Sequence, residues 1–136
     1  MKIFYKTTAT ATGGRSGTAA LNDGSFSVQM VRPDSGEAGV NPEQLFAVGY
    51  AACFHSALRL VARQDGADVS DSTVGSRVSL SSNDAGGFVL AVELEITLPN
   101  VDHDTAQALA EKAHQVCPYS NATRGNIDVL LTVTDD

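Results

Sequence analysis

The chain has no tryptophan and few other aromatic residues, with five Phe and three Tyr among 136 residues. Cysteine and proline are also scarce, with two and four residues respectively. Hydrophobic residues nevertheless make up 43% of the chain, which predicts a folded protein whose core is built from Ala, Val and Leu. The length suffices for one domain with its own core and is short for two, so we expect residues 1–136 to form a single domain.

Basic residues are outnumbered, with nine Lys and Arg against 16 Asp and Glu and a formal charge of −7 at pH 7. No cluster of Lys and Arg interrupts this negative charge. A chain of this kind repels phosphate backbones and anionic lipid headgroups. We therefore expect no nucleic acid and no membrane among its partners.

The N-terminal residues 1–12 alternate polar and apolar side chains and lack the apolar core of a signal peptide. We also expect no later apolar stretch to approach the ~20 residues that span a bilayer. These two expectations favour a cytoplasmic protein. In a reducing cytosol, two cysteines rarely form a permanent structural disulfide. Catalytic, redox or metal-binding thiols must then be weighed against two inert thiols in the core.

Two segments near the N-terminus alternate in hydrophobicity and predict strands at residues 2–11 and 25–31. A glycine-rich turn is expected at residues 13–17 and a loop at 32–40. Asn41, Pro42 and Glu43 then mark a helix start, because Asn can cap, Pro suits the first helical position and Glu suits the positive end of the helix dipole. This helix should run to about Gln64 and, being apolar on nearly all sides, should be central and buried.

The second half of the chain predicts a hairpin, a helix and a last strand. Residues 74–80 and 88–98 alternate cleanly on either side of a turn at 83–87. Asp102 or Asp104 can cap a second helix that ends near Pro118, and residues 127–133 form the last strand. This order of elements indicates an α+β domain.

Cys53 lies in the middle of the long apolar helix, where burial raises the pKa of a thiol and leaves it unreactive. A reactive Cys53 therefore needs a cation brought from elsewhere in the fold. Arg15 is the candidate, because the glycines around it allow close approach and its guanidinium does not lose its charge. Glu43 could orient that arginine; the alternatives are a solvated loop arginine and a simple partner of the helix dipole.

Cys117 precedes Pro118, which cannot continue helical hydrogen bonding, so this thiol lies where the chain changes direction. Such a cysteine could resolve an oxidised partner. Attack of a Cys53 thiolate on a peroxide would give a sulfenic acid, which Cys117 would trap as a disulfide. An external dithiol would then restore both thiols.

The histidines raise the alternative of a zinc site formed by Cys53, His55, His114 and Cys117. Helix geometry disfavours it, because residues two apart, such as Cys53 and His55, point to different faces. We therefore expect no metal, and His103 is expected at the surface. The sequence also contains no GxSxG, P-loop, HExxH or GxGxxG motif in a suitable context.

Three segments together resemble one known family. They are Ala11-Thr12-Gly13-Gly14-Arg15, then Asn41-Pro42-Glu43-Gln44-Leu45-Phe46-Ala47 through Gly49-Tyr50-Ala51-Ala52-Cys53-Phe54, and Cys117-Pro118-Tyr119-Ser120-Asn121-Ala122-Thr123-Arg124-Gly125-Asn126. In this order, over essentially the whole chain, they resemble the organic hydroperoxide resistance proteins of the OsmC/Ohr superfamily, on its Ohr branch. The resemblance implies an α+β intertwined homodimer, with two long central helices packed between two antiparallel sheets.

The resemblance also implies an activity and residue roles. It implies a peroxidase that reduces organic hydroperoxides, with Cys53 as the attacking thiol, Cys117 as the resolving thiol, and Arg15 and Glu43 as the activating pair. No cofactor is expected to be bound; the reductant would be an external dithiol, dihydrolipoamide on a lipoylated protein.

Apolar side chains near Cys53, Phe46 and Phe54 among them, would favour alkyl hydroperoxides over hydrogen peroxide. Two alternatives remain at this point. One is an OsmC-type peroxidase of broader substrate range. The other is a non-enzymatic binder of a lipid-like ligand, or a redox sensor.

Glu43 and Cys53 are ten residues apart on the predicted helix, which places them roughly 15 Å apart along it and about 80° around its axis. Two groups so far apart do not readily share one arginine within a chain. If the helix packs antiparallel against that of a second copy, Glu43 of one chain can lie beside Cys53 of the other. The sequence therefore predicts a composite site.

Overall fold

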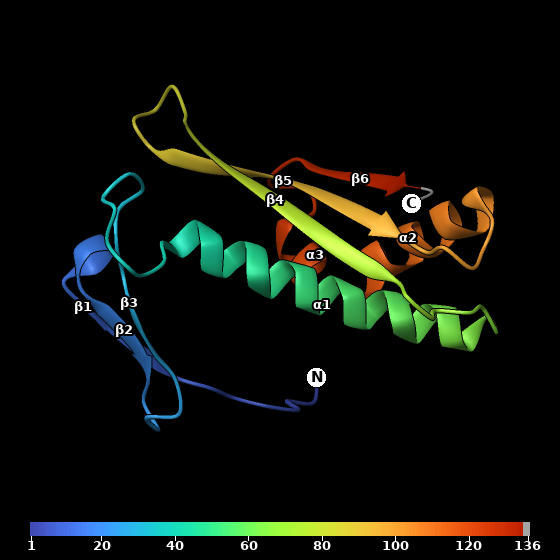
Figure 1. Cartoon of the computed structure of the whole chain (residues 1–136), viewed down its shortest axis with the longest axis horizontal. Helices are drawn as coiled ribbons and strands as arrows, with labels where there is room; N and C mark the ends of the chain where they lie inside the picture. The colour runs from blue at the N-terminus through green and yellow to red at the C-terminus, as the bar shows by residue number, and fades with distance from the viewer. Residues whose placement is uncertain (135–136) are drawn as a thin grey trace. The chain divides into compact units, whose positions relative to one another are not determined.

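A computed structural model describes residues 1–134 of the chain (Figure 1). It divides into two compact units, Met1–Leu45 and Phe46–Asp136, and each is described by itself.

The first unit contains a three-stranded antiparallel sheet of β1 (Ala9–Thr12), β2 (Thr18–Leu21) and β3 (Ser27–Gln29). A single 3₁₀ turn, η1 (Gly14–Ser16), joins β1 to β2 at the predicted glycine-rich turn. The predicted strand at 2–11 forms only from Ala9 onward. Residues 2–8 pair with no strand in the described part of the chain, and the side chains of Ile3 and Tyr5 are exposed. Strand β2, only four residues long, was not predicted.

Helix α1 (Pro42–Gln64) has the bounds that the sequence predicts. Its first turn is a capping box: Gln44 N–H donates to Asn41 Oδ1 at 2.8 Å, and Asn41 N–H donates to Gln44 Oε1 at 2.8 Å. Pro42 follows the cap, where its missing N–H costs no helical hydrogen bond. The predicted helix start is confirmed.

Only one face of α1 is buried within the chain; it carries Tyr50, Phe54, Ala57, Leu58, Val61 and Ala62. Val48 is 68% exposed and Leu60 is 43% exposed. With 23 residues and a mean hydropathy of 1.5 over its most apolar window, α1 is long and apolar enough to span a bilayer. The expectation that no apolar stretch approaches this length is therefore wrong. Its buried face belongs to the hydrophobic core, so α1 is a core helix.

The second unit contains a sheet ordered β4 (Thr73–Ser82), β5 (Phe88–Thr97), β6 (Val129–Thr134). Strands β4 and β5 form the predicted hairpin, and alternate residues of β5 (Val92, Leu94 and Ile96) enter the core. Strand β6 pairs parallel to β5. The expectation of two antiparallel sheets is thus wrong for this sheet, which is mixed. Helices lie between β5 and β6 in the chain, and such a crossover returns the chain in the same direction.

Two helices connect β5 to β6. Helix α2 (His103–Val116) begins at Asp102, whose carboxylate accepts the N–H of Thr105 at 2.7 Å, as one of the two predicted caps. Helix α3 (Pro118–Thr123), which was not predicted, begins two residues after α2 ends. Figure 1 shows α1, α2 and α3 on one face of the β4–β5–β6 sheet, where their apolar residues form the core.

Candidate active site

The two cysteines meet in the second unit. Cys53 lies on α1 and Cys117 lies between α2 and α3, and their Sγ atoms are 3.5 Å apart. Both are free thiols. A disulfide requires an S–S distance of about 2.0 Å, so the sulfurs need to approach by only a small movement. The structure therefore brings together the two thiols that the sequence singled out.

The two thiols differ in accessibility. Cys117 is fully buried, whereas Cys53 is half-buried and lines an open groove. Burial raises the pKa of the Cys53 thiol, and a hydrogen bond from the backbone N–H of Tyr119 opposes that rise. A small molecule can therefore reach Cys53 from the groove, while Cys117 is shielded from solvent.

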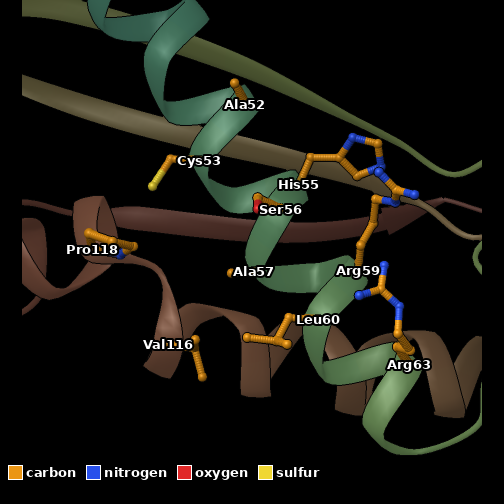
Figure 2. Close-up of a pocket in the computed structure, with 10 residues that line it drawn as sticks. All are labelled: Ala52, Cys53, His55, Ser56, Ala57, Arg59, Leu60, Arg63, Val116 and Pro118. Atoms are coloured by element: carbon orange, nitrogen blue, oxygen red, sulfur yellow. The ribbon is translucent and has the colours of Figure 1, made fainter. Parts of the chain in front are cut away.

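The groove has a volume of ≈ 780 Å³ and follows α1 from Ala52 to Arg63 (Figure 2). Its walls are formed by Ala52, Cys53, His55, Ser56, Ala57, Arg59, Leu60, Arg63, Val116 and Pro118. Figure 2 shows Cys53 pointing toward the segment of Pro118, whereas His55 and Arg59 extend on the other side of α1. Neither side chain therefore points toward the thiol.

Arg15 and Glu43 form a two-pronged ion pair in the first unit. Arg15 Nη1 donates to Glu43 Oε2 at 2.8 Å, and Nη2 donates to Oε1 at 2.6 Å. The glycines on either side of Arg15 allow the tight turn η1 that carries it. A Cβ on Gly17 would lie 1.7 Å from the carbonyl oxygen of Thr12, and Gly13 has a left-handed φ of 82°.

The ion pair fixes the charge of both groups. Hydrogen bonds from Arg15 lower the pKa of the Glu43 carboxyl, and the same bonds raise the pKa of Arg15. Glu43 therefore stays ionised at neutral pH and orients the guanidinium. The pair lies within Met1–Leu45 and the two thiols lie within Phe46–Asp136.

Aromatic residues near the thiols have different environments. Phe46 is half-buried and contacts the rings of Tyr50 and Tyr119, at centroid distances of 5.8 and 5.9 Å. Phe54 is fully buried in the core and does not line the groove. Tyr119 was not singled out by the sequence as a site residue. Its ring packs so closely on α1 that a Cβ at Gly49 would lie 2.8 Å from its hydroxyl oxygen.

The histidines weighed as zinc ligands have hydroxyl partners. His55 Nε2 is 2.9 Å from Ser72 Oγ, and His114 Nδ1 is 2.8 Å from Ser120 Oγ. Within residues 1–134, no three His, Cys, Asp or Glu side chains gather in a way that could hold a metal ion.

Comparison with known proteins extends these observations. The family model for OsmC-like protein matches residues 34–132. An organic hydroperoxide resistance protein of Xanthomonas axonopodis pv. citri (strain 306) is 48% identical over 137 residues, which cover 97% of this chain and 96% of that protein.

Two solved structures are similar to this chain. That of the organic hydroperoxide resistance protein OhrB of Bacillus subtilis has a TM-score of 0.91 and 42% identity, covering 97% of this chain and 100% of the other. That of an organic hydroperoxide resistance protein from Elizabethkingia anophelis, with thiocyanate bound, has a TM-score of 0.90 and 48% identity and covers all of both chains.

The fold and the paired thiols define an α+β protein of the OsmC-like class. Within that class, the chain belongs to the organic hydroperoxide resistance proteins of the OsmC/Ohr family. The resemblance found from its three sequence segments is thus confirmed.

Oxidation of the reduced protein with diamide should join Cys53 to Cys117 within one chain, because the two sulfurs are already 3.5 Å apart. Peptide mapping by mass spectrometry under non-reducing conditions would detect the linked peptides. Cys117→Ser serves as the control and should give only diamide adducts or links between chains. Two unmodified thiols in the oxidant-treated wild-type protein would contradict the observed pairing.

Proposed function

We propose that the protein is a cysteine-dependent peroxidase that reduces organic hydroperoxides to alcohols. The observation that carries this proposal is the pairing of a thiol that reaches a groove, Cys53, with a fully buried thiol 3.5 Å away, Cys117. The Cys53 thiolate attacks the terminal peroxide oxygen and breaks the O–O bond. Cys53 becomes a sulfenic acid, and the departing alkoxide takes a proton to leave as the alcohol.

The second step closes the disulfide. The Cys117 sulfur attacks the Cys53 sulfenic acid, the S–S bond forms, and the sulfenic oxygen leaves as water. An external dithiol then reduces the disulfide and is itself oxidised. We propose a dihydrolipoyl group on a lipoylated protein as this reductant, with no cofactor bound by the chain itself. Its thiolate would attack Cys53 from the groove, since Cys117 is buried.

Arg15 and Glu43 are the proposed activating pair. Burial raises the pKa of the Cys53 thiol. Ionisation of this thiol at neutral pH therefore requires a cation close to its sulfur. The forked guanidinium of Arg15, oriented by Glu43, can stabilise a thiolate and then the negative charge that develops on the peroxide oxygens.

The preferred substrates are proposed to be hydroperoxides with an apolar alkyl group. Ala52, Leu60, Val116 and Pro118 give the groove an apolar wall beside Cys53. An alkyl group buried there gains hydrophobic stabilisation that hydrogen peroxide cannot gain. We propose that Phe46 also contacts the substrate; Phe54, which the sequence suggested as a second contact, is fully buried and lies outside the groove. A cytoplasmic location is proposed, because both thiols must be returned to the reduced state.

Cys53→Ser should abolish reduction of cumene hydroperoxide, whereas Cys117→Ser should react once and then stall or overoxidise. Wild-type protein should turn over with dihydrolipoamide and prefer cumene hydroperoxide to hydrogen peroxide. Peroxide consumption should be measured over many equivalents, with thioredoxin as the alternative reductant. If the protein consumes only one equivalent of peroxide with each reductant, it is instead a redox sensor. Equal rates of reduction of the two peroxides would indicate an OsmC-type enzyme of broad substrate range.

Arg15→Lys should slow sulfenate formation nearly as much as Arg15→Ala, because lysine keeps the charge and loses the fork that two Glu43 oxygens hold. We expect a loss of about 100-fold for Arg15→Ala, the scale seen when one charge-stabilising donor is removed from an active site. Rapid-mixing measurement of sulfenate formation tests this, with Arg77→Lys as a control for an exposed arginine in another ion pair. A wild-type rate in Arg15→Ala would remove Arg15 from the proposed site.

A homodimer is proposed because α1 leaves an apolar side chain uncovered away from its core face. Val48 is 68% exposed on a helix that is otherwise a core element. A second copy of α1 would bury this side chain by a two-fold contact. In such a dimer, Glu43 of one chain is proposed to serve Cys53 of the other.

Mixed dimers test the composite site. Inactive Cys53→Ser and impaired Glu43→Ala proteins, co-refolded in equal amounts, should recover roughly a quarter of wild-type activity, since half the dimers are mixed and each has one intact site. The fraction of mixed dimers should be verified by native mass spectrometry with differently tagged chains. Verified mixed dimers that are no more active than the parents would show that the carboxylate does not act across chains.

A further inference from the structure

A chain of buried hydroxyl groups lies beside the two thiols and has no part in the mechanism above. Tyr50 Oη is 2.8 Å from Ser120 Oγ and 3.1 Å from Thr123 Oγ1. His114 Nδ1 is 2.8 Å from Ser120 Oγ. We call these four residues (His114, Ser120, Tyr50 and Thr123) the hydroxyl chain; Tyr50 and Ser120 are both fully buried.

Counting protons fixes the direction of the hydroxyl chain. Thr123 Oγ1 donates its one proton to the carbonyl oxygen of Ser120. Tyr50 must then donate to Thr123, Ser120 must donate to Tyr50, and His114 must donate to Ser120 from Nδ1. This single arrangement satisfies every contact. Burial, together with the charge of Arg124, lowers the pKa of His114, which favours the neutral ring that this arrangement uses.

The hydroxyl chain connects the three helices around the cysteines. Tyr50 lies on α1 three residues before Cys53, and Ser120 lies on α3 three residues after Cys117. The contact between Tyr50 and Ser120 therefore lies about one helical turn from the contact between the two sulfurs. His114, on α2 three residues before Cys117, joins Ser120 across the break between α2 and α3.

The backbone of Cys117 is already held on its own two helices. Its N–H donates to Ala113 O at 2.8 Å, and its carbonyl accepts the N–H of Asn121 at 2.9 Å. Neither bond reaches α1, which carries Cys53. Beside the thiols, α3 contacts α1 through the N–H of Tyr119, which donates to Cys53, and through the hydrogen bonds that Tyr50 makes with Ser120 and Thr123.

We propose that Tyr50 and Ser120 are positioning residues that hold Cys117 against Cys53 for closure of the disulfide. This inference rests on the proposed peroxidase mechanism and deepens its second step. The reaction is the one given above: the Cys117 sulfur displaces the oxygen of the Cys53 sulfenic acid, which leaves as water. A looser α3 leaves the sulfenic acid exposed in the groove, where a second peroxide oxidises it to the sulfinic acid.

Tyr50→Phe is the most specific variant, because it keeps the ring and the bond between His114 and Ser120 and removes only the hydrogen bonds of the Tyr50 hydroxyl with Ser120 and Thr123. Sulfenate formation should keep the wild-type rate, and disulfide closure should slow by about tenfold, the scale expected for a lost buried hydrogen bond that orients a reacting group. The peroxide concentration that converts half of Cys53 to sulfinic acid should fall by the same factor. Ser120→Ala, which breaks both contacts, should slow closure at least as much.

The matched control is Thr97→Val, which removes a half-buried hydrogen bond between two hydroxyls, 2.8 Å from Thr97 Oγ1 to Thr134 Oγ1, in the sheet of the same unit. Quenched-flow samples with cumene hydroperoxide, trapped with dimedone and analysed by mass spectrometry, give both rates; thermal unfolding is measured for every variant. Closure that slows in Tyr50→Phe and Ser120→Ala, and not in a control of similar stability, supports the inference.

Wild-type closure rates in Tyr50→Phe and Ser120→Ala would overturn the inference, as would equal slowing in Thr97→Val. Failure of the proposed function gives a different result, namely no sulfenate in the wild-type protein. In that case diamide still tests the positioning, because Cys117 closes the disulfide by displacing the hydrazine from a Cys53 adduct. Closure from this adduct must again be slower in Tyr50→Phe than in Thr97→Val.

Discussion

Pro118 cannot continue α2, because it has no N–H to donate and its ring favours an extended conformation for the residue before it. Cys117 accordingly has φ −60° and ψ 125° and serves as the end of α2 and the cap of α3. The position of the buried thiol, the direction of α3 and the approach of Tyr119 to α1 all follow from this one break. Gly49 completes the arrangement, since any larger residue would meet the Tyr119 ring.

The same close packing creates an electrostatic problem for Cys53. A thiol half-buried against a second thiol has a raised pKa, and the N–H of Tyr119 opposes that rise only in part. An oriented arginine beside a thiol offsets such a rise in pKa, because the guanidinium stays charged whatever its surroundings. In the first unit, Glu43 holds both terminal nitrogens of Arg15 and leaves the guanidinium in a fixed orientation. Burial protects Cys117, and the proposed role of the ion pair is to restore to Cys53 the reactivity that burial removes.

The sequence predicted the elements whose signals are local. The capping residues around Asn41 predicted the start of α1, and strict alternation predicted β4 and β5. It missed β2 and α3, which have four and six residues and too little periodicity to detect. The parallel pairing of β6 depends on long-range contacts with β5 and has no local signal. Cys53 and Cys117 were identified as chemistry-bearing residues, but the Tyr50–Ser120 contact joins positions 70 residues apart and was not predicted.

The sequence indicated that α1 is buried on nearly all sides, whereas the structure of the single chain buries only one face of this helix. Its 3.6-residue period places Tyr50, Phe54, Leu58 and Val61 on the core face, and Val48 and Leu60 on faces that remain exposed in the single chain. Cys53 lies at the border between these faces, near enough to the core to meet Cys117 and near enough to the surface to reach the groove. A thiol one position along, at Phe54, would be sealed in the core. One at Ala52 would be exposed, since the side chain there already is. The border position is therefore the one at which a single thiol can meet both a molecule from solution and a protected partner thiol.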